Sequence, residues 1–122
     1  MSTQVTERTI EERLQIAQSL RIEGRYDEAE VILQAILGEE PDNTQARREW
    51  GLILGFIGRF EESIEELRRV VEADPDWLEA RNDLAMSYAM VGMVDEARAE
   101  FELILEVDPT NAMALRQIVY FR

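Results

Sequence analysis

Three matching stretches decide the fold: EGRYDEAE at residues 23–30, IGRFEESI at 57–64 and VGMVDEAR at 91–98. Their glycines are spaced by 34 residues, at Gly24, Gly58 and Gly92. The same interval separates EEPDN, ADPDW and VDPTN, which contain the only prolines of the chain, Pro41, Pro75 and Pro109. Two independent markers with one period identify an internal repeat.

Each repeat contains two apolar patterns of helical period, and one more pattern follows the third repeat. We expect helices at 10–23, 27–40, 44–57, 61–73, 78–91, 95–107 and 112–122. Each glycine ends a first helix, where a left-handed backbone is favourable. Each proline ends a second helix, because the residue before proline avoids helical geometry. In two of the three repeats, residues at the start of the first helix have the spacing of a capping box, Thr9 with Glu12 and Asp76 with Glu79.

Small residues mark where the two helices of a repeat touch. They occur in the first helices and again twelve positions later in the second helices, at Ala17 and Ala29, Gly51 and Ser63, and Ala85 and Ala97. Two helices approach closely where both contact residues are small. Large apolar residues surround these contacts, so one hairpin cannot cover its own apolar face, whereas stacked hairpins can.

Each repeat has the same order of features: a small residue, an apolar residue, a glycine turn, an alanine, a large apolar residue and a proline. This order resembles that of the tetratricopeptide repeat family. The resemblance implies an all-α fold, a right-handed superhelical stack of antiparallel helix hairpins with seven helices. Its parts would be a tail at 1–9, repeats at 10–43, 44–77 and 78–111, and a closing helix at 112–122. The family often has tryptophan at the fourth position of the repeat. This chain has Arg13, Arg47 and Arg81 there, and we expect their charges to reach water.

The composition argues against catalysis. The chain of 122 residues has no cysteine and no histidine, which removes disulfides, thiolate chemistry and the usual proton carrier near neutral pH. Its carboxylates lack the spacing of a calcium loop, and no phosphate-binding glycine loop is present. We therefore expect that the protein is not an enzyme and has no cofactor and no metal site.

The net charge of −13 limits the partners. A chain this acidic repels phosphate backbones and anionic lipid, so we expect no nucleic-acid partner. The longest apolar stretch, at 50–57, is too short to span a bilayer, and no signal peptide is visible. We expect a cytoplasmic protein without membrane insertion.

The resemblance also implies a concave groove lined by the first helix of each repeat. We predict that a peptide contacts Leu14, Gln18, Arg21, Arg48, Leu52, Phe56, Asn82, Met86, Met90, Arg116 and Tyr120, with Glu11, Gln45, Glu79 and Met113 at the rim. Leu52 with Phe56, and Met86 with Met90, have i, i+4 spacing on a face away from the core stripe. They bind a partner or pack on the neighbouring first helix. Gly55 would let a ligand backbone approach.

The charges of the groove leave two interpretations. Arg48 and Arg116 grip a carboxylate of the partner, or the groove arginines pair with acids of the protein itself, namely Glu49, Glu79 or Asp83. The resemblance argues against one ligand class. Family members that clamp acidic chaperone tails use basic and Asn side chains at five positions. These positions correspond here to Leu14, Gln18, Glu49, Glu79 and Asp83, and the three acidic residues among them would repel such a tail.

We predict a protein-interaction scaffold or adaptor that binds a peptide or helix segment of another protein. One alternative is a structural or oligomerisation module of a larger assembly, and another is an acidic chaperone resembling those of bacterial secretion systems. Self-association would use the closing helix. We expect Leu115, Ile118 and Val119 to face the core, and Tyr120 and Phe121 to lie near an open end.

Overall fold

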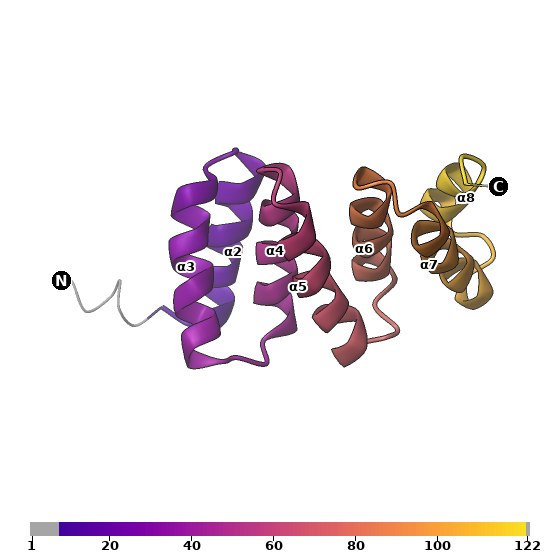
Figure 1. Cartoon of the computed structure of the whole chain (residues 1–122). Coiled ribbons are helices and arrows are strands. Elements are labelled where there is room, and N and C mark those ends of the chain that lie inside the picture. Colours follow the sequence, from indigo (N-terminus) through magenta and orange to yellow (C-terminus); the bar gives the residue numbers. More distant parts are fainter. Residues whose placement is uncertain (1–7, 122) are drawn as a thin grey trace.

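The structure is a computed structural model that describes residues 8–121. Within them lie seven helices and no strand: α2 (Ile10–Ile22), α3 (Tyr26–Glu39), α4 (Thr44–Phe56), α5 (Phe60–Ala73), α6 (Leu78–Met90), α7 (Val94–Val107) and α8 (Ala112–Ile118). Figure 1 shows them as successive hairpins, α2 with α3, α4 with α5 and α6 with α7, followed by α8. The all-α prediction is confirmed. The first six helices agree with the predicted bounds to within one residue at each end. Most of the predicted tail at 1–9 lies outside the described residues.

The three glycine turns end the first helices, as predicted. Gly24, Gly58 and Gly92 have φ angles of 81°, 86° and 79°, in the left-handed region that favours glycine. Each turn reverses the chain, so that the second helix of the repeat runs back along the first.

The capping of the first helices is only partly as predicted. The hydroxyl of Thr9 accepts the backbone N–H of Glu12, and the Glu12 carboxylate accepts the N–H of Thr9, which completes a capping box. The second predicted box, Asp76 with Glu79, is wrong. Helix α6 begins directly after Trp77, whose side chain makes no capping hydrogen bond.

The helices of each hairpin pack through the predicted small residues, all six of which are buried. A Cβ atom added to Gly51 would lie 2.9 Å from the side chain of Leu67 on α5. The Ser63 hydroxyl donates to the carbonyl oxygen of Gly51 at 2.7 Å, so this buried polar group is satisfied inside the interface. A Cβ atom at Gly55 would lie 3.4 Å from the Ser63 hydroxyl. Gly55 therefore faces α5 and not the groove, contrary to our expectation.

The buried core forms two clusters that each extend beyond one hairpin. One joins α2, α3 and α4 and contains Leu33 and Ile36. The other joins α5, α6, α7 and α8 and contains Leu84, Phe101 and Ile104. Because residues of adjacent repeats share a cluster, the repeats stabilise one another, as expected for a stacked array.

The arginines at the fourth repeat position form ion pairs and do not extend into water as we expected. In the second repeat, Arg47 donates to the Glu66 carboxylate at 2.5 Å and to the carbonyl oxygen of Pro41 at 2.8 Å. In the third repeat the same contacts are made by Arg81 with Glu100 and Pro75. Arg13 pairs instead with Glu39. In the second and third repeats, the arginine thus joins both helices of a hairpin to the turn before it.

Helix α8 is shorter than predicted, since it ends at Ile118. Ile118 is buried, as predicted, but Leu115 and Val119 are 45% and 57% exposed, so two of the three predicted core residues are wrong. Val119 lies one period after Ala85, which α7 covers. No second helix follows α8 within residues 8–121, so that position stays open.

The end of the described chain folds back onto α7. Phe121, predicted to lie near an open end, is half-buried, and its ring centroid is 5.4 Å from that of Phe101. Its backbone carbonyl oxygen also accepts a hydrogen bond from Arg98. Tyr120 is 77% exposed, as predicted.

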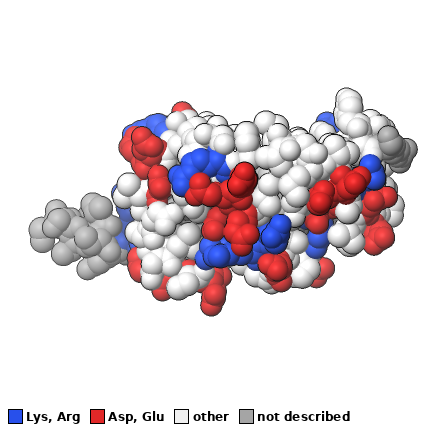
Figure 2. All heavy atoms as spheres, viewed as in Figure 1, with Lys and Arg blue, Asp and Glu red and all other residues white. Residues whose placement is uncertain are grey.

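The face drawn in Figure 2 separates charged from uncharged surface. Acidic and basic side chains gather across its middle, over α5, where Glu62 pairs with Arg59 and Glu65 with both Arg68 and Arg69. The upper edge, where Figure 1 places the turns from α4 to α5 and from α6 to α7, is largely uncharged. Of the helices described, none combines the length and apolar character needed to cross a membrane.

Candidate peptide-binding groove

The first helices lie next to one another, with α2 in contact with α4 and α4 with α6. We call the surface of α2, α4, α6 and α8 that faces away from the second helices the groove. A pocket of about 360 Å³ opens on it, lined by Glu11, Leu14, Gln15, Gln18, Gln45, Arg48, Glu49 and Trp77. A second pocket of about 330 Å³ shares Gln45 and Trp77 and is also lined by Thr44, Asp74 and Asp76.

The structure brings several of the predicted site residues to the first pocket. Leu14, Gln18 and Arg48 line it directly. Arg21 reaches it through a hydrogen bond to Glu49, another lining residue. Three predicted residues from two neighbouring helices therefore share one cavity.

The apolar part of the predicted site lies toward the ends of α4 and α6 that carry the glycine turns. Phe56 is 58% exposed and Met90 is 63% exposed, whereas Leu52 is half-buried. The ring of Phe56 stacks on that of Tyr26 with 5.9 Å between centroids, so the preceding repeat supports it on one side. Met86 is 37% exposed. Phe56 and Met90 thus offer apolar surface that the core does not use.

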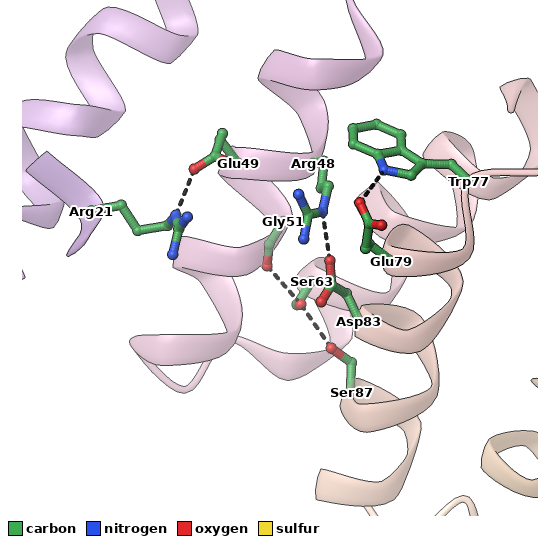
Figure 3. Close-up of polar contacts among 9 residues, drawn as sticks. All are labelled: Arg21, Arg48, Glu49, Gly51, Ser63, Trp77, Glu79, Asp83 and Ser87. Atoms are coloured by element: carbon green, nitrogen blue, oxygen red, sulfur yellow. Dashed lines mark hydrogen bonds and ion pairs between the residues drawn. The ribbon is translucent and has the colours of Figure 1, made fainter. Parts of the chain in front are cut away.

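Two of the three predicted groove arginines, Arg21 and Arg48, are held by acids of the protein itself (Figure 3). Arg21 Nε donates to Glu49 at 2.5 Å, and Arg48 Nε donates to Asp83 at 2.6 Å. The Arg48 guanidinium also lies over the Trp77 ring, 5.2 Å from its centroid. The interpretation in which groove arginines pair with acids of the protein is therefore confirmed for Arg21 with Glu49 and Arg48 with Asp83, and Arg48 is not poised to grip the carboxylate of a partner.

These ion pairs link the first helices of successive repeats, with little access to water. Burial raises the pKa of the Asp83 carboxyl above its ordinary value, although Arg48 opposes the shift. A carboxyl whose pKa is higher in the folded state than in the unfolded state stabilises the folded protein at low pH. This contribution to the free energy of unfolding is lost as the pH rises through the pKa of the folded state. Asp83 thus adds little stability at neutral pH through its own charge.

The remaining predicted residues do not reach the pocket. Asn82 is only 7% exposed, and its Oδ1 is buried without a hydrogen-bond partner among residues 8–121. Arg116 lies exposed on α8 and Tyr120 lies just after it. The structure therefore divides the predicted site into a pocket between α2 and α4, an apolar end, and a separate region at α8.

Sequence reasoning missed Trp77 and Gln15, which line the first pocket. No pattern marks Gln15. Trp77 carried a signal, because the repeat places it in register with Asn43 and Asn111, so one repeat of three has an aromatic residue where the others have asparagine.

Comparison with known proteins identifies the repeat. The sequence model of the tetratricopeptide repeat matches residues 58–117. The first TPR of Spaghetti (RPAP3), bound to the HSP90 peptide SRMEEVD, superposes with a TM-score of 0.85 at 16% identity, over 92% of this chain and 89% of that chain. MamA from Desulfovibrio magneticus RS-1 gives 0.84 at 19% identity, over 95% and 66%. YrrB, a TPR protein with an unusual peptide-binding site, gives 0.81 at 19% identity, over 94% and 59%. No curated protein sequence matched.

These structures share the fold of this chain. Because their sequence identities are only 16% and 19%, the similarity shows the fold alone. The sequence model covers α5, the third repeat and most of α8, and the glycine turns recur at equivalent places in all three repeats. Residues 58–117 carry the sequence pattern of the tetratricopeptide repeat family, and the described chain has the fold of tetratricopeptide repeat proteins.

Proposed function

We propose that the chain is a protein-interaction scaffold, and not an enzyme, that binds a peptide or helix segment of another protein in its groove. The observation that carries the proposal is the pairing of a pocket with exposed apolar side chains on the same surface. Ligand sites are typically concave and combine apolar surface with a few polar groups. Of the structures that share this fold, that of Spaghetti holds a bound HSP90 peptide, and YrrB has an unusual peptide-binding site.

The apolar end of the groove would supply most of the affinity. Phe56 and Met90 hold large apolar areas in water, and methionine adapts to different partners because its side chain is flexible. Burying two or three such side chains leaves a few kcal/mol after ordering costs, which corresponds to a dissociation constant of roughly micromolar.

The ligand would differ from the acidic chaperone tails that some members of the family clamp. Glu49 and Asp83 stand at two of the clamp positions, and each already holds an arginine of the groove. A ligand carboxylate would have to displace them, in a chain whose net charge is −13. We therefore expect a neutral or basic segment.

A structural role in an assembly is a second candidate. The end of the array exposes Met113, Leu115, Val119 and Tyr120, by 41%, 45%, 57% and 77%. Terminal repeats normally carry a polar outer face, so apolar side chains here favour contact with another copy or another domain.

The groove is tested with peptides selected on the protein from a library of random 12-residue sequences. Replacing Phe56 and Met90 together with alanine should weaken the selected peptides by about tenfold or more, since the contact loses two apolar side chains. Val31→Ala with Val107→Ala is the matched control, because these valines are 70% and 64% exposed on α3 and α7. Isothermal calorimetry gives the affinities. Equal losses in both double variants, or none in either, would contradict binding in the groove.

A further inference from the structure

Trp77 interrupts a helix-capping pattern that the neighbouring repeats keep. The side chain of Asn43 accepts the N–H of Ala46 at 2.8 Å, and that of Asn111 accepts the N–H of Ala114 at 3.0 Å. Trp77 stands at the equivalent place and makes no such bond. An asparagine that caps a helix N-terminus normally stabilises the helix, so α6 lacks this contribution to its stability. Places where a local rule fails are often functional.

Trp77 lines both pockets, and acidic residues line each of them as well. Glu11 lines the first pocket, and Asp74 and Asp76 line the second. The carboxylate of Glu79 accepts a hydrogen bond from the indole N–H at 3.2 Å (Figure 3). None of these four carboxylates forms an ion pair with an arginine within residues 8–121. Their negative charge is therefore not balanced by the part of the chain described.

The two arginines nearest the pockets are already paired. Arg48 lies over the indole but pairs with Asp83, and Arg21 pairs with Glu49. Each pair sums to zero charge, so the unpaired charge that remains is that of Glu11, Asp74 and Asp76 in the pockets and of Glu79 beside the indole. A ligand approaching Trp77 meets a negative potential next to an aromatic surface.

We infer that the segment bound in the groove carries a lysine or arginine whose side chain lies against Trp77, with its charge among Glu11, Asp74, Asp76 and Glu79. The inference rests on the proposed function and adds the chemistry of the ligand to it. The indole suits the aliphatic stem of a basic side chain, and the carboxylates suit its charged end.

The spacing between the two ends of the groove limits the ligand further. Arg48, beside the indole, and Phe56, at the apolar end, are eight residues apart on α4. Eight residues of helix extend about 12 Å, which about four residues of extended chain cover. The ligand should therefore carry a basic residue about four positions from an apolar one.

Three fluorescein-labelled 12-residue peptides test the inference. All three peptides have leucines at the same positions. Three other positions, each about four residues from a leucine, carry lysine in the first peptide, glutamine in the second and glutamate in the third. Fluorescence anisotropy at low and physiological salt gives their affinities. The lysine peptide should bind about fivefold or more tightly than the glutamine peptide, and the glutamate peptide should bind most weakly. Added salt should reduce the preference for lysine.

Matched variants locate the effect. Glu11→Gln with Glu79→Gln should weaken the lysine peptide by about threefold to tenfold and change the affinity of the glutamine peptide much less. Glu102→Gln with Glu106→Gln changes the net charge equally on exposed positions of α7 and should have little effect. Trp77→Asn should also weaken the lysine peptide, whereas Trp77→Phe should retain most of its affinity.

Each failure has a separate meaning. If no peptide binds, both the proposed function and the inference are wrong. If the three peptides bind equally, or the glutamate peptide binds best, the groove function stands and the basic ligand is wrong. Equal losses in the two double-glutamine variants would assign the attraction to the overall charge of the protein and overturn the site at Trp77.

Discussion

Replacing Phe101 with alanine will lower the free energy of unfolding by about 3–5 kcal/mol, whereas the same substitution at Phe56 will lower it by about 1 kcal/mol. Phe101 has no exposed surface and packs in the cluster that joins α5 to α8. Removing its ring leaves a cavity and also removes the tilted aromatic contact with Phe121. Phe56 is 58% exposed and loses chiefly its contact with Tyr26.

Urea denaturation followed by circular dichroism measures both variants against the unaltered protein. Because residue type and substitution are the same, the difference reports mainly how deeply each ring is buried. A loss of several kcal/mol at Phe56 would assign this ring to the core and remove it from the binding surface.

Replacing Arg21 with methionine will lower the free energy of unfolding by about 2–3 kcal/mol, because it leaves the charge of Glu49 buried without its partner. Glu49 is 6% exposed, and its hydrogen bond to Arg21 is 2.5 Å long. Adding Glu49→Leu should recover most of the loss, since a buried ion pair can often be replaced by apolar residues of similar size at little cost.

The same denaturation measurements complete the double-mutant cycle. If Arg21→Met with Glu49→Leu is as unstable as Arg21→Met alone, the cost does not come from the stranded carboxylate. The arginine would then act through the packing of its aliphatic stem.

The hairpins could be predicted from sequence because their ends are marked by residues with strong backbone preferences. Gly24 and its equivalents have the left-handed backbone that the turn requires, and proline follows each second helix. The contacts between the two helices of a hairpin could also be predicted from sequence, because the small residues Ala17, Gly51 and Ala85 recur with the same period. All three are buried in the structure.

The closing helix was mispredicted because it packs on α7 from one side only, and no helix follows it within residues 8–121 to cover its other side. Its short sequence has apolar residues on several faces, so helical period alone does not choose between Leu115 and Ala114. The repeat does choose, because Ala114 and Ile118 continue the buried series of Ala80 and Leu84. Leu115 stands in register with Arg81, and at the end of the array that position is exposed.

The candidate site was only partly predictable. The exposure of Phe56 and Met90 follows from their spacing on the helix. The ion pairs of Arg21 and Arg48 join residues 28 and 35 positions apart, so they depend on how repeats are rotated against each other, which no local pattern specifies. The role of Trp77 in the pocket depends on the same rotation.

The most direct test of the account maps a bound peptide on the protein. In a titration of the ¹⁵N-labelled chain with the lysine peptide, followed by amide chemical shifts, we expect the largest changes at groove residues of α2, α4 and α6. These include Gln18, Arg48 and Phe56, with the indole N–H signal of Trp77 shifting at the same peptide concentration. Changes confined to α3, α5 and α7, or to α8 alone, would contradict the claim that the groove is the binding surface.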